Sequence, residues 1–87
     1  MGFRDTGKHP LSIDELAAQI YRGLFPIVFV NTLPSDGIPG GHALVVVGLD
    51  LTDVTVYDSL YGERDLPRAT FENAWAMLQN LTLLMQR

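Results

Sequence analysis

The sequence contains no cysteine, few basic side chains and no long apolar run. Without cysteine the chain has no disulfide bond, no thiolate ligand for a metal ion and no thiol nucleophile. Its six Lys and Arg residues are scattered along the chain, and ten Asp and Glu residues bring the net charge to −4. Such a surface repels a phosphate backbone, so we expect no nucleic-acid partner. The apolar runs are too short to cross a bilayer, so we also expect no membrane insertion.

The composition is that of a folded protein. Apolar side chains make up 47% of the 87 residues, which is enough for a hydrophobic core, and the length suits one domain spanning residues 1–87. The N-terminal residues lack the basic-then-apolar order of a signal peptide, so the default expectation is a cytoplasmic protein. No motif implies a cofactor.

Apolar periodicity predicts two helices and four strands. Ser12 and Glu15 form a capping-box pattern at the start of a helical repeat that ends at Gly23. A second helix is expected from about Thr70 to Gln79. The expected strands are 27–30 and 43–47, both buried on two faces, then 54–58 and 81–85, with irregular segments at 31–41 and 59–69. The order α-β-β-β-α-β predicts an α+β fold with an antiparallel four-stranded sheet and two helices.

His42 is the ionisable residue that stands out, because it follows two glycines and begins the most apolar strand. One interpretation is a half-exposed histidine that pairs with a backbone carbonyl at the mouth of the strand. Asp58, near the end of the next strand, suggests a second interpretation. A three-residue hairpin loop at 50–52 would set Asp58 opposite Leu44 and place the side chains of His42 and Asp58 on one face. A loop of two or four residues would break this arrangement.

A histidine beside an aspartate is the base-and-orienter part of a catalytic triad, in which the carboxylate fixes the tautomer of the imidazole. The sequence offers no clear nucleophile for it. Ser12 is better used as a helix cap, Ser35 lies in a proline-rich loop and Ser59 directly follows the aspartate. A metal site is a poor alternative, because only His9 could add a second imidazole and zinc sites usually need three or four converging ligands.

Three segments occur in a familiar order: Gly-His-Ala-Leu-Val-Val-Val-Gly at 41–48, Val-Tyr-Asp-Ser-Leu-Tyr-Gly at 56–62 and Phe-Glu-Asn-Ala-Trp at 71–75. From about Leu16 to Leu84, the chain resembles the C-terminal half of the papain-like cysteine peptidases of family thirty-nine. These are the bacteriocin-processing leader peptidases of peptide exporters and their free-standing relatives. The resemblance implies a papain-like half-domain with His42 as the base and Asp58 as the orienter. Ser59 stands where the family usually has proline.

The resemblance also implies a nucleophilic cysteine and an oxyanion-hole glutamine, carried by an N-terminal half that has no counterpart in this sequence. Three hypotheses stay open. The chain is a half-domain completed by a partner chain, or a non-catalytic relative that binds an extended peptide, or a structural or self-associating domain in which the pair is a relic. In the family the cysteine helix packs on the sheet face of the pair. We therefore expect a homodimer or another protein partner to cover the apolar side chains there, unless residues 1–24 do so: Leu44, Val46, Val54 and Val56.

Overall fold

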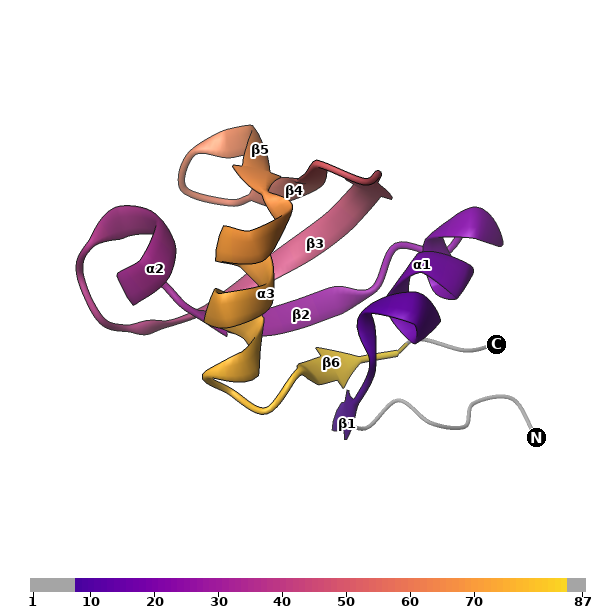
Figure 1. Ribbon diagram of the computed structural model, residues 1–87, viewed down its shortest axis with the longest axis horizontal. Coiled ribbons are helices and arrows are strands. Elements are labelled where there is room, and N and C mark those ends of the chain that lie inside the picture. Colours follow the sequence, from indigo (N-terminus) through magenta and orange to yellow (C-terminus); the bar gives the residue numbers. More distant parts are fainter. Residues whose placement is uncertain (1–7, 85–87) are drawn as a thin grey trace.

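The computed structural model describes residues 8–84 and shows a curved antiparallel sheet with helices packed inside the curve (Figure 1). In chain order the elements are β1 (Lys8–Pro10), α1 (Ile13–Tyr21), β2 (Ile27–Asn31), α2 (Leu33–Asp36), β3 (Gly41–Leu49), β4 (Asp53–Asp58), β5 (Gly62–Pro67), α3 (Arg68–Ala76) and β6 (Leu81–Leu83). The strand order across the sheet is β1-β6-β2-β3-β4-β5. The predicted α+β class with an antiparallel sheet is confirmed. The prediction of four strands and two helices was wrong, because the described chain forms six strands and three helices.

The missed elements are short or have the wrong composition for their conformation. β5 contains three consecutive charged residues, which is atypical of a strand, and it forms because it pairs with β4 along its whole length. β1 has only three residues and depends on its pairing with β6. α2 is a single turn within the expected loop, with Pro34 near its start and Gly37, at φ 77°, at its end. In each case a neighbouring strand or a local turn determines the conformation, and no hydrophobic periodicity in the sequence predicts the element.

The two long helices begin in different ways. In α1 the capping box is confirmed: the amide of Ser12 donates to Glu15 Oε1 at 2.8 Å, and the amide of Glu15 donates to Ser12 Oγ at 3.1 Å. α3 begins earlier than expected, directly after β5, so Thr70 lies inside its first turn and does not cap it. There the amide of Arg68 donates to the carbonyl of Thr52 at 2.8 Å, which satisfies one of the unpaired donors at a helix start.

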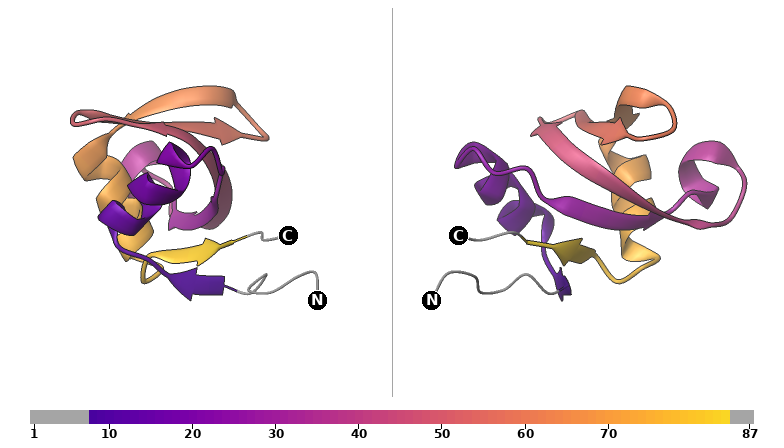
Figure 2. Two further views of the ribbon diagram at one scale, coloured as in Figure 1. Left: turned by 90° about the vertical axis from the view of Figure 1, so that its right-hand side faces the viewer. Right: turned by 180° about the vertical axis from the view of Figure 1, so that it is seen from behind.

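Both long helices pack on the concave face of the sheet, as the two views of Figure 2 show. Leu16 of α1 joins Phe71, Ala74 and Trp75 of α3 in one core with the inward side chains of the sheet. That core contains the apolar side chains for which a partner was expected, and they are at most 4% exposed: Leu44, Val46, Val54 and Val56. The stated exception therefore applies: α1, from residues 1–24, covers them together with α3, and these four side chains need no partner chain.

The opposite face of the sheet carries no helix within residues 8–84. Val28 and Val30 of β2 are buried on the concave side, whereas the residues that alternate with them are only half-buried. The same alternation holds along β3 around Leu44 and Val46. The expectation that these two strands are buried on both faces was therefore wrong. Among the described helices, none has the length and apolar character needed to cross a membrane.

Candidate functional site

His42 and Asp58 lie on the same, concave face of the sheet, on the adjacent strands β3 and β4. The register is the expected one at this end, because Val45 pairs with Tyr57 and the next pair along would be Leu44 with Asp58. Residues 50–52 connect the two strands, as expected, but the pairing next to this loop is offset by one residue from the expected pairing of Leu49 with Asp53. Leu49 pairs with Val54, and the register then shifts by one residue between Val46 and Gly48. This irregularity is a β-bulge, and it restores the parity that the offset pairing of Leu49 with Val54 would have broken.

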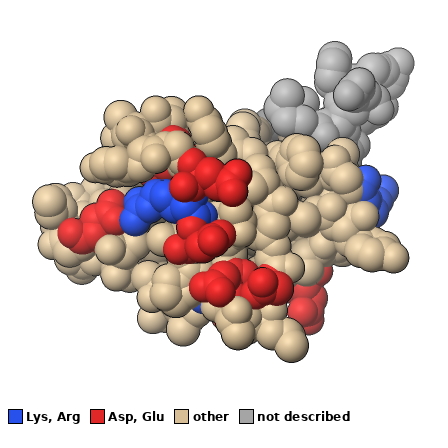
Figure 3. All heavy atoms as spheres, turned by 90° about the horizontal axis from the view of Figure 1, so that it is seen from above, with Lys and Arg blue, Asp and Glu red and all other residues tan. Residues whose placement is uncertain are grey.

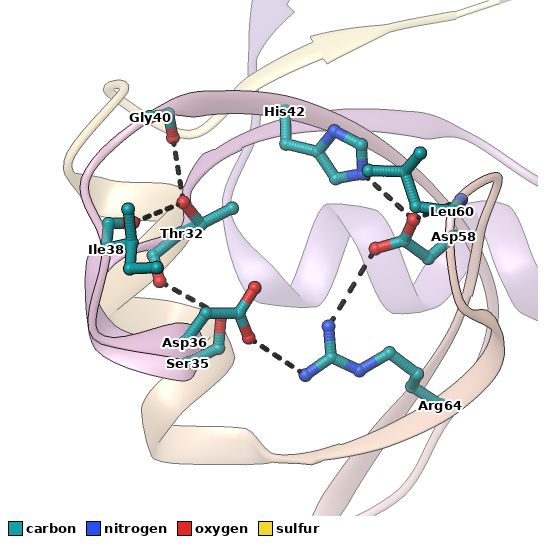
Figure 4. A network of polar contacts seen from close by, with 9 residues as sticks. All are labelled: Thr32, Ser35, Asp36, Ile38, Gly40, His42, Asp58, Leu60 and Arg64. Atoms are coloured by element: carbon teal, nitrogen blue, oxygen red, sulfur yellow. Dashed lines mark hydrogen bonds and ion pairs between the residues drawn. The ribbon is translucent and has the colours of Figure 1, made fainter.

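The two side chains are in direct contact. His42 Nε2 lies 3.0 Å from Asp58 Oδ1, so the partner of the imidazole is a carboxylate and not the backbone carbonyl of the simpler interpretation. The same oxygen accepts a hydrogen bond of 2.7 Å from the amide of Leu60, in the turn that follows β4. The Asp58 side chain is 2% exposed and the His42 side chain 21%. The acceptor is thus buried and held by two hydrogen bonds, while the imidazole is partly exposed; Figure 4 shows the ring directed at the carboxylate.

The environment of Asp58 keeps its carboxyl group ionised. Burial by itself raises the pKa of Asp58, but the hydrogen bonds from His42 and from the amide of Leu60 outweigh burial and hold the pKa below its ordinary value. An ionised carboxylate can only accept hydrogen bonds, so Nε2 of His42 must carry the proton that they share. In the neutral ring the other nitrogen, Nδ1, is then unprotonated and free to act as a base.

The pair lines a small pocket between α2, β5 and α3. Two hydroxyl groups in its wall are already engaged with the backbone. Thr32 Oγ1 donates to the carbonyl of Ile38 at 2.6 Å, and Ser35 Oγ donates to the carbonyl of Thr32 at 3.4 Å. Neither arrangement aims a hydroxyl at His42, so the pocket wall supplies no activated nucleophile.

Sequence reasoning missed two charged residues of this site. Arg64 of β5 and Asp36 of α2 both line the pocket. The Nη2 atom of Arg64 lies 3.0 Å from Asp36 Oδ1, and its Nη1 atom lies 3.8 Å from Asp58 Oδ2. Arg64 could have been placed at the site only through its pairing with Val56, whose side chain points into the core. That pairing requires the strand β5, which the sequence analysis did not predict.

The charges around the site are mixed, but acidic groups are the more numerous. Figure 3 looks down on the β4–β5 side of the molecule and shows basic groups flanked by acidic ones. Within residues 8–84, no group of three or more metal-ligating His, Asp or Glu side chains is gathered, and the side chain of His9 lies outside the described part of the chain. The site is therefore built around one buried carboxylate, one imidazole and one guanidinium.

In the comparison with protein families, the model of the Peptidase_C39 like family matches residues 3–83. Searches of curated proteins and of solved structures found no match. The matched segment contains both strands of the His42–Asp58 pair and both long helices. The chain belongs to the Peptidase_C39 like family.

Proposed function

We propose that this chain is a peptidase-like domain that supplies the base and the orienter of a papain-like site. It is inactive alone because it has no cysteine, and it binds a peptide or a partner chain that completes the site. On this proposal residues 1–87 correspond to the C-terminal half of a family member. The observation that carries the proposal is the 3.0 Å contact between His42 Nε2 and the buried Asp58 carboxylate.

The chemistry follows from the protonation states of the pair. Nδ1 of His42 accepts the proton of a thiol brought by the partner, and the thiolate attacks the carbonyl carbon of the peptide bond. Asp58 stabilises the imidazolium that forms, and the imidazolium then gives its proton to the leaving amine. Water hydrolyses the resulting thioester. Without the thiol, the site can bind a peptide beside the pair but cannot cut it.

A reconstitution experiment tests the proposal. The purified chain is mixed with a separately produced cysteine-bearing half of an active family member, and cleavage of a fluorogenic peptide is followed. We expect no cleavage by either half alone, cleavage by the mixture, and loss of that cleavage in His42→Ala. Cleavage by this chain alone in the presence of chelators would refute the proposal and point to an unrecognised nucleophile such as Ser59. Cleavage by the mixture that His42→Ala leaves unchanged would refute the role of the pair.

A second candidate is a self-associating domain without catalysis, and the outer face of the sheet favours it. Four apolar residues are paired in one row across the strands: Leu83, Ile27, Val45 and Tyr57. Tyr57 is 52% exposed, the other three are half-buried, and Glu63 ends the row on β5. Contiguous apolar surface of this kind often marks an interface, and we propose a homodimer as its occupant.

Light scattering across a dilution series tests this second candidate. We expect a dimer that dissociates on dilution, and a monomer at all concentrations for Val45→Lys. Glu63→Lys is the control, because it changes a charge at the polar end of the same row. A wild-type chain that stays monomeric at high concentration would exclude the homodimer.

A further inference from the structure

Arg64 occupies a distinctive place beside the His42–Asp58 pair. It comes from β5 and points to the concave face, because it pairs with the buried Val56. Its guanidinium lies between the carboxylates of Asp36 on α2 and Asp58 on β4 (Figure 4). It also lies over the ring of Tyr61, at 5.4 Å from the ring centre. A planar cation held on three sides has little freedom of orientation.

The two carboxylate oxygens of Asp58 contact different groups. Oδ1 faces His42 and the amide of Leu60, at 3.0 and 2.7 Å, whereas Oδ2 faces Arg64 Nη1 at 3.8 Å. Arg64 is thus the charged group beside Oδ2, the carboxylate oxygen that does not contact His42. Rotation of the carboxylate would break the bonds at Oδ1, and the guanidinium beside Oδ2 disfavours that rotation.

The short contact of Arg64 is with Asp36, at 3.0 Å, and the side chains of both residues are about 28% exposed. Asp36 lies in α2, the single helical turn that connects β2 to the start of β3 and forms a wall of the pocket. The ion pair therefore ties this wall to β5 across the pocket, next to the buried carboxylate.

We propose that Arg64 is a positioning residue, clamped by Asp36, that holds the Asp58 carboxylate against His42 and ties α2 to the pair. The importance of this residue for catalysis rests on the proposed function, which assigns catalysis to the His42–Asp58 pair. The contacts of Arg64 with Asp36 and Asp58, called the clamp below, need no partner chain or substrate. Loss of the cation removes the positive charge beside Oδ2 and loosens the pocket wall, so water reaches the shared proton and the Leu60 amide more often.

Two signals measured by NMR on the full chain test the clamp: exchange with water of the His42 Nε2–H proton and of the Leu60 amide. In Arg64→Gln we expect both to exchange about threefold faster or more, as for loss of an ion pair of ordinary strength. Asp36→Asn should show part of this change. Arg64→Lys should restore part of the protection, because it keeps the charge without the planar fork.

Two controls separate the clamp from general loosening. Arg68→Gln removes another guanidinium of 28% side-chain exposure, paired with Glu72 at 2.9 Å, and should leave both signals unchanged. The amide of Asp53, which donates to Asp50 Oδ1 at 2.7 Å in a turn away from the site, should exchange normally in Arg64→Gln and Asp36→Asn. Unchanged His42 and Leu60 exchange in folded Arg64→Gln and Asp36→Asn would overturn the proposal. Since no partner or substrate is needed, this result is independent of the reconstitution assay.

Discussion

His42 and Asp58 meet across β3 and β4 because one residue of β3, at the bulge between Val46 and Gly48, has no partner in β4. On the loop side of the bulge, Leu49 pairs with Val54 and both point to the core. On the other side, the register has moved by one residue, so His42 and Asp58 again share the concave face. Without the shift, a one-residue offset would turn His42 to the outer face.

Deletion of Val47 should leave His42 in contact with Asp58. The shortened β3 can pair Val46 with Val56 and Gly48 with Thr55 in an unbroken ladder. We expect a loss of about 1 kcal/mol, since a half-buried valine is removed, while the His42 Nε2–H signal persists in NMR spectra. Insertion of one alanine after Val45 is the matched control. It should turn His42 outward and abolish the signal, and its persistence there would contradict the parity argument.

Asp58→Ala should destabilise the protein by about 2 kcal/mol, because it leaves the His42 ring and the Leu60 amide without their buried acceptor. Urea denaturation measures the change. Asp50→Ala also removes a carboxylate that accepts two backbone amides, but in an exposed turn where water can replace it. The loss should therefore be smaller than for Asp58→Ala. Equal losses in the two variants would show that burial of Asp58 contributes nothing.

The stability of the protein should fall in acid in part because Asp58 must be protonated. Its folded-state pKa is lowered, so between the folded and unfolded values the unfolded chain binds more protons. The contribution is therefore fully present above about pH 4 and is lost as the pH falls through the folded-state pKa. Urea denaturation from pH 7 downward should show a flatter profile for Asp58→Asn.

The pKa of Asp50 is also lowered, chiefly by hydrogen bonds from the amides of Asp53 and Thr52, so Asp50 titrates in the same direction. Asp50→Asn is therefore the comparison for the acid profile. An Asp58→Asn profile as steep as the wild type would mean that Asp58 does not contribute to the acid transition.

Gln79→Gly should stabilise the protein by about 0.5–1 kcal/mol. Gln79 is exposed and has a φ of 61°, in the left-handed region that glycine adopts without strain. Asn80 has a similar φ of 56°, but its side-chain amide donates to the carbonyl of Leu11 at 2.8 Å. Asn80→Gly should therefore gain nothing or lose stability. Thermal unfolding of the two variants compares them, and a destabilised Gln79→Gly would contradict the strain argument.

The elements that carry their own local signal could be predicted from the sequence. The capping box at Ser12 fixed the start of α1, because its hydrogen bonds lie within four residues. Apolar runs located β2 and β3, alternation of apolar and polar residues located β4, and the spacing of His42 and Asp58 suggested a pair. The absence of cysteine, which rules out thiol catalysis by this chain, is a property of the composition and needs no structure.

Only the tertiary structure decided which surfaces the elements share. β5 forms a strand because it pairs with the edge of β4. Arg64 reaches the site only because of this pairing. The bulge in β3 and the packing of α1 and α3 on one face depend on contacts between segments far apart in the chain. Local periodicity cannot encode such contacts, because it records which side chains face a core and not which element covers them.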